Sequence, residues 1–74
     1  MNIEVFKTNV EDVEEAGRII ETIQEAYQMY KANFDLQDCD RILRIVSLNG
    51  PIEQGNLIAL IKNSGYYAEV LPDY

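Results

Sequence analysis

The residues best suited to chemistry lie close together, in the stretch NFDLQDCDRI at residues 33–42. Cys39, the only cysteine, lies there among Asp35, Asp38 and Asp40. A thiolate binds soft metals, but such a metal needs a second sulfur or an imidazole, and the chain has no histidine. The carboxylates are hard ligands and lack the spacing of a calcium loop. The stretch therefore favours a turn, with Cys39 as a candidate metal ligand or redox thiol.

A second stretch, GPIEQGNL from Gly50, imitates a phosphate-binding loop. Its glycines have the right spacing, but Asn56 and Leu57 stand where a lysine and a hydroxyl residue would meet the phosphate and magnesium. Without histidine, a serine or cysteine nucleophile has no ordinary base, and the acidic residues show no pattern that would line a cleft. The sequence therefore predicts a protein that is not an enzyme and holds no cofactor.

The composition indicates a small, acidic, folded protein. With 74 residues, of which 47% are hydrophobic and 26% charged, we expect a single domain over residues 1–74. The net charge of −7 comes from residues 1–40, where ten acids outnumber three bases. An acidic surface repels phosphate groups, which argues against nucleic acid and anionic membranes as partners.

The cellular location follows from what the sequence lacks. The N-terminus has neither the basic start nor the apolar stretch of a signal peptide. No run approaches the ~20 apolar residues that a membrane-spanning helix needs. A single cysteine suits a reducing compartment. We therefore expect a cytoplasmic protein without membrane insertion.

The first half of the chain predicts a strand and then a long helix that together position these residues. IEVFK alternates as a strand, with Phe6 on the face opposite to Ile3 and Val5. The helix that follows would be capped by Thr8 or Asn9. Its buried stripe would run through Val13, Ala16, Ile20, Ile23, Tyr27 and Tyr30.

The second half predicts a hairpin, a helix and a last strand. Residues 33–36 alternate in polarity, QDCD forms a turn, and RILRIVS forms a strand with Leu43 and Ile45 on one face. NLIALIKNS predicts a helix that ends at Gly65, and YYAEVL predicts the last strand. With right-handed crossovers, this order gives an α+β, ferredoxin-like βαββαβ sandwich, in which two helices cover one face of a four-stranded antiparallel sheet.

The hairpin and the closing strand carry a family resemblance. NFDLQDCDRILRIVS, an apolar helix and SGYYAEVLPD resemble the heavy-metal-associated domain family, which includes copper chaperones and the N-terminal domains of metal-pumping ATPases. The first strand and helix fit too, so the resemblance covers nearly the whole chain. That family binds soft metals through M-x-C-x-x-C after the first strand. Here the loop reads KTNVEDVEE, with Val10 and Val13 at the cysteine positions, so the resemblance implies the fold and a degenerate metal-binding domain.

The face of the predicted sheet without helices is the candidate interaction surface. With the first strand between the third and fourth, apolar side chains would gather there. The predicted interaction face consists of Phe6, Ile42, Val46, Tyr67 and Leu71. Such a patch favours a protein-interaction module that binds a protein partner or forms a homodimer. RNA recognition on a similar face would need a basic setting and an aromatic residue in RILRIVS, and the chain offers neither.

Two alternatives stay open at this point. The patch is interrupted by Glu4, Arg44 and Glu69, and an apolar surface of modest size is tolerated by many proteins. The other alternative is a divergent, metallochaperone-like protein that handles metal through Cys39, shared across a dimer. It predicts metal binding that is lost in Cys39→Ser.

Overall fold

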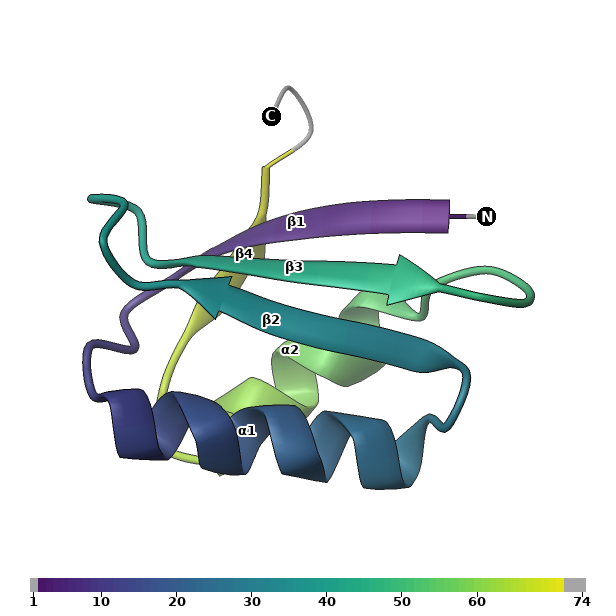
Figure 1. Cartoon of the computed structure of the whole chain (residues 1–74), viewed down its shortest axis with the longest axis horizontal. Coiled ribbons are helices and arrows are strands. Elements are labelled where there is room, and N and C mark those ends of the chain that lie inside the picture. The colour runs from purple at the N-terminus through teal and green to yellow at the C-terminus, as the bar shows by residue number, and fades with distance from the viewer. Residues whose placement is uncertain (1, 72–74) are drawn as a thin grey trace.

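The computed structural model describes residues 2–71 and arranges them as one sheet covered by two helices (Figure 1). In chain order the elements are β1 (Asn2–Thr8), α1 (Val13–Ala26), β2 (Tyr30–Asp35), β3 (Ile42–Ser47), α2 (Gln54–Asn63) and β4 (Ala68–Val70). Neighbouring strands are antiparallel in the order β2-β3-β1-β4. Both helices lie on the same side of the sheet (Figure 1). The predicted ferredoxin-like α+β fold is thus confirmed.

The core lies between the sheet and the helices. Its buried members are Phe6, Val10, Ala16, Ile19, Ile23, Tyr30, Leu43, Ile45, Leu57, Ile61 and Ala68. Burial of each large apolar side chain contributes roughly 1.5–3 kcal/mol. Since a chain with one cysteine has no internal disulfide, this packing is the main source of its stability.

Helix α1 begins later than the sequence predicts. Its N-cap is Asp12, whose carboxylate accepts a hydrogen bond from the Glu14 N–H at 2.8 Å. The two predicted caps serve other elements: Thr8 belongs to β1, and the Asn9 side chain accepts a hydrogen bond from the Tyr67 N–H at 2.8 Å. Asp, Asn and Thr all cap helices well, so residue type alone does not choose among them. The extension of β1 through Thr8 moves the cap downstream.

The buried side of α1 also differs from the prediction. The buried residues of this helix are Ala16, Ile19 and Ile23. Val13 is 76% exposed, because it lies in the first turn beyond the edge of the core. The helix ends at Ala26, and Tyr30 begins β2 instead of closing the helical stripe. The apolar residues that the sequence predicts to form one helical stripe therefore belong to two elements, α1 and β2.

The second half of the fold follows the predictions closely. Leu43 and Ile45 of β3 lie together in the core. Gly65 has φ +93°, the left-handed conformation expected of a residue that ends a helix. Tyr66 and Val70 pack against the core on either side of the buried Ala68. Within residues 2–71, neither α1 nor α2 has the length and apolar character to cross a membrane.

Candidate protein-interaction face

Phe6 does not lie where the sequence places it. Its Cα partners are Leu43 on β3 and Val70 on β4, and its side chain is fully buried in the core. Phe6 thus faces the helices and is not part of an interaction face. IEVFK has apolar residues on both sides, so its alternation shows which side chains share a face but not which face is buried. The larger ring buries more apolar area than valine, which favours Phe6 in the core.

The side of the sheet away from the helices is apolar at its centre. We call it the open sheet face and define its apolar members as Ile3, Val5, Met29, Ile42, Val46, Leu48, Tyr67 and Leu71. Ile3 is paired with Val46, and the Leu71 N–H donates to the Val5 carbonyl at 2.8 Å. These contacts make the apolar surface continuous across β3, β1 and the end of β4.

Two members of this face, Met29 and Leu48, lie just beyond the strand ends and were not predicted from the sequence. The Leu48 N–H donates to the Met29 carbonyl at 2.9 Å, which continues the ladder that pairs Val46 with Lys31. Alternation then places Met29 and Leu48 on the same side as Val46. The period of two in RILRIVSL already pointed to Leu48. Met29 was hidden, because the predicted helix extended past it.

The apolar side chains of the open sheet face differ in exposure: some are buried and others are accessible to solvent. Ile42 is fully buried and Val5 is 8% exposed. The predicted accessibility of Ile42 is therefore wrong. Val5 has chain on both sides, since Arg44 is its partner on β3 and the Leu71 N–H donates to its carbonyl, whereas Ile3 of the same strand lies beyond the end of this pairing. The large apolar side chains with high exposure are Ile3 (56%), Leu48 (54%), Met29 (51%), Tyr67 (46%) and Val13 (76%). All but Val13 belong to the open sheet face.

Charged side chains border this apolar face and, at Arg44, which is paired with Val5, interrupt it. Those on the open sheet face are Lys7, Lys31, Asp35, Arg44 and Glu69. Lys7 lies 3.7 Å from the Asp40 carboxylate, and Arg44 donates to the Asn33 side-chain oxygen at 3.3 Å. The opposite side is acidic, since α1 and the loop before it contain Glu11, Asp12, Glu14, Glu15, Glu21 and Glu25 but only one base, Arg18. The two sides of the molecule therefore differ in charge: the helix side is acidic, and the open sheet face has more bases than acids.

The turn between β2 and β3 holds the candidate metal ligands. The Cys39 sulfur and one carboxylate oxygen each of Asp38 and Asp40 lie within 4.8 Å of one another. Asp38 also accepts a hydrogen bond from the Asp40 N–H at 2.9 Å, as aspartate commonly does in turns. Asp35 stands outside the cluster and accepts the Gln37 N–H at 3.2 Å. The stretch is the turn that the sequence predicts, with an exposed thiol at its tip.

The family's metal-binding positions contain no ligand in this chain. Val10 is fully buried in the core, and Val13 is an exposed residue of α1. Neither valine has a lone pair to donate. Val10 therefore contributes to packing, at a position that the predicted resemblance aligns with a cysteine.

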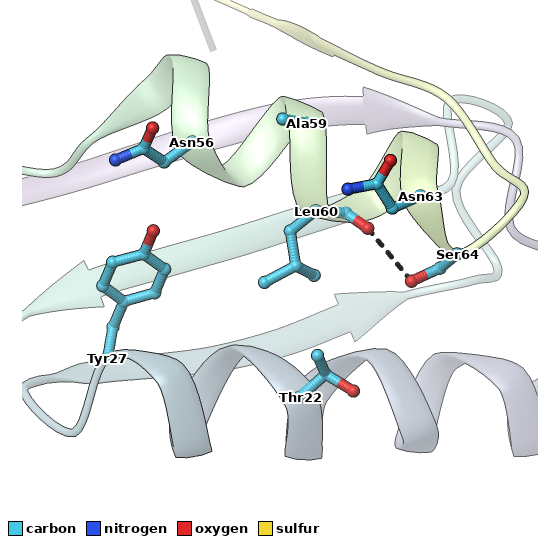
Figure 2. Close-up of a pocket in the computed structure, with 7 residues that line it drawn as sticks. All are labelled: Thr22, Tyr27, Asn56, Ala59, Leu60, Asn63 and Ser64. Atoms are coloured by element: carbon cyan, nitrogen blue, oxygen red, sulfur yellow. Dashed lines mark hydrogen bonds between the residues drawn. The ribbon is translucent and has the colours of Figure 1, made fainter.

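The hollow between α1 and α2 brings polar groups together but no acid–base pair (Figure 2). Its volume is about 430 Å³, and its lining residues are Thr22, Tyr27, Asn56, Ala59, Leu60, Asn63 and Ser64. The Ser64 hydroxyl donates to the Leu60 carbonyl at 3.0 Å. None of these side chains is a carboxylate, an imidazole or a thiol, so the hydroxyls of Thr22 and Ser64 have no general base among the lining residues.

The chain was compared with protein-family models, curated proteins and solved structures, and no match was found. The resemblance to heavy-metal-associated domains thus rests on the hairpin and closing-strand sequences quoted above. It stays a prediction, and the fold class is described from the structure itself.

Proposed function

We propose that the chain is a non-catalytic, cytoplasmic interaction module that binds a protein partner through the open sheet face. The observation that carries this proposal is the gathering of Ile3, Met29 and Leu48 at one end of that face, each about half exposed. Tyr67 has a similar exposure at the other end of the face. Contiguous exposed apolar side chains are characteristic of interaction sites. The exposed, unpaired thiol of Cys39 suits the reducing compartment that the proposal requires.

The charges around the open sheet face indicate the chemistry of the partner. Lys7, Lys31 and Arg44 outnumber Asp35 and Glu69 there. A complementary surface is apolar at its centre and has carboxylates at its rim. The acidic side formed by α1 would repel such a partner, so the charges also fix which side of the molecule it approaches.

The proposal is tested by removing the exposed apolar groups. In the double variant Ile3→Ser/Leu48→Ser, both positions lie outside the core, so the fold should persist. We expect partner binding to weaken by about tenfold or more, since central apolar contacts dominate most interfaces. The measurement is quantitative affinity capture from the cells that express the protein, followed by titration with the captured partner.

The matched control is Val13→Ser, which removes an even more exposed apolar side chain from α1. It should leave capture unchanged. Circular dichroism melting of each variant confirms that it is folded. Equal loss in both variants, or no loss in the double variant, would show that the open sheet face does not bind the partner.

Metal handling at the turn is a second candidate function, favoured by the clustering of Cys39, Asp38 and Asp40. One thiolate and two carboxylates could give three ligands to a divalent ion such as Zn²⁺, which accepts sulfur and oxygen ligands. The contact of Lys7 with Asp40 competes with such an ion. A second copy of the chain would have to supply the remaining ligand.

Zinc titration by calorimetry tests this candidate. Cys39→Ser should abolish binding, and Asp35→Asn, which alters a carboxylate outside the cluster, should retain it. Binding that survives Cys39→Ser would exclude the thiol as a ligand.

A further inference from the structure

Strand β2 forms one free edge of the sheet. Its charge pattern is complementary to that of a second β2 strand that runs in the opposite direction. Within residues 2–71, the order β2-β3-β1-β4 leaves one side of β2 without a neighbouring strand. Lys31 and Asp35 are exposed and lie two residues on either side of Asn33. All three side chains are on the open-sheet-face side, because their partners on β3 are Val46, Arg44 and Ile42.

The backbone of β2 offers hydrogen-bonding groups along this edge. The Met29 carbonyl accepts from Leu48 across the ladder, so odd-numbered residues of β2 form hydrogen bonds with β3. Even-numbered residues point outward, as the Ala32 N–H shows by donating to the Gln24 side chain at 3.1 Å. The N–H and C=O of Phe34 have the same orientation and face the free edge. Such an edge is a template for an added strand.

An apolar groove runs beside this edge, between β2 and α1. Its apolar lining comes from Val13, Ala16, Gly17 and Ile20 of the helix and from Phe34 and Leu36, and Asn33, Asp35 and Gln37 complete it. No atom lies within 4 Å of the position that a Cβ on Gly17 would occupy. The groove therefore has room for apolar side chains from a strand added at the edge.

We propose that two copies of the chain pair antiparallel along β2, about a two-fold axis at Asn33, and form one continuous sheet. In this register Lys31 lies opposite Asp35 of the second copy, and the symmetry repeats this contact. Ala32 lies opposite Phe34 of the second copy, so the Phe34 N–H donates to the Ala32 carbonyl. The Ala32 N–H exchanges its bond to the Gln24 side chain for one to the Phe34 carbonyl. A parallel pairing in register would instead place like charges side by side.

The second copy also provides apolar groups of the right position. Alternation places Ala32 and Phe34 of its β2 on the groove side, and Lys31 and Asp35 on the open-sheet-face side. Charge and apolar matching thus both come from the same six-residue strand. The pairing leaves the open sheet face uncovered and does not depend on the proposed function.

The test exchanges the two charges and measures the oligomeric state by sedimentation equilibrium. Lys31→Asp places two acids opposite each other at each contact, and Asp35→Lys places two bases there. Each single variant should weaken dimerisation by about tenfold or more. The double variant Lys31→Asp/Asp35→Lys should restore it. An equimolar mixture of the two single variants should form a heterodimer, because opposite charges then meet at both contacts.

The mixture also controls for folding. If each single variant is monomeric alone but the two associate when mixed, both variants must be folded. Asp35→Lys loses the hydrogen bond from Gln37, and circular dichroism shows whether the turn change affects the fold. Hydrogen exchange gives an independent measurement: the Phe34 amide should slow as the protein concentration rises, while that of Lys31 stays constant. A wild-type chain that is monomeric at all concentrations, or a dimer insensitive to both charge reversals, would overturn the proposal. These variants change two charges of the open sheet face but none of its apolar members, and Ile3→Ser/Leu48→Ser leaves β2 unchanged. Dimerisation and partner capture are thus measured with separate variants, so the two proposals fail separately.

Discussion

The hydroxyl of Tyr30 joins β2 to the segment that leads into α2. It accepts a hydrogen bond from the Glu53 N–H at 2.8 Å and donates to the Pro51 carbonyl at 3.2 Å. Its ring is buried and stacks on Tyr27, with the ring centres 4.9 Å apart. A residue that helical periodicity places at the end of α1 thus fixes the start of the second helix, and the hollow between the helices depends on its position.

Tyr30→Phe should destabilise the protein by about 1–2 kcal/mol, because it leaves the Glu53 N–H and the Pro51 carbonyl without this partner. The melting temperature should fall by about 4–8 °C for each kcal/mol in a domain of this size. Tyr27→Phe is the matched control, since no other residue in 2–71 hydrogen-bonds to the Tyr27 hydroxyl. Equal melting temperatures of the two variants would contradict the assigned role of the Tyr30 hydroxyl.

The two glycines near the ends of α2 have opposite roles. Gly65 follows the helix with φ +93°, a conformation that L-residues rarely adopt. Gly55 lies within the first turn, and no atom is within 4 Å of the position that its Cβ would occupy. One glycine is needed by the backbone geometry, whereas the other only lowers helix propensity.

Gly65→Ala should therefore destabilise the protein by about 1 kcal/mol or more, and Gly55→Ala should stabilise it by about 0.5–1 kcal/mol. Urea unfolding of the two variants measures both changes. Shifts of the same sign would mean that α2 does not end as the structure shows.

The order of strands and helices could be predicted from the sequence because each element has a clear apolar period and is bounded by turn residues. The boundaries of α1 could not, since Thr8, Asn9 and Asp12 are all good caps and only the length of β1 selects Asp12. The face of β1 could not either. Its two sides are both apolar, and burial of Phe6 depends on packing against Leu43 and Val70, which lie far away in the chain.

The candidate site was predicted in outline for the same reasons. Val46, Tyr67 and Leu71 lie on the open sheet face as expected, because their strands have one face that is clearly marked by core residues. Phe6 is replaced there by Ile3 and Val5. Ile42 shares the face but is buried, since exposure depends on neighbouring strands and not on alternation alone.

The two sides of the whole molecule differ in chemical character. The helices cover one face of the sheet and carry the excess of acidic residues, while the other face is apolar and bears three of the six basic residues. The free edge of β2 lies between them. A partner on the apolar members of the open sheet face and a second copy on the edge can therefore bind at the same time, with Lys31 and Asp35 at the border between the two surfaces.

The most direct test of the interaction module is photo-crosslinking from Tyr67 in living cells. A benzophenone amino acid at position 67 is larger than tyrosine, but the Tyr67 side chain is 46% exposed, so the added ring extends into solvent and reports contacts at the open sheet face. The same amino acid at Tyr27 reports on the helix side. We predict a discrete crosslinked partner from position 67 and none from position 27, and that partner should be lost with Ile3→Ser/Leu48→Ser. Crosslinks from position 27 alone, or none from position 67, would contradict the assignment of the open sheet face as the binding surface.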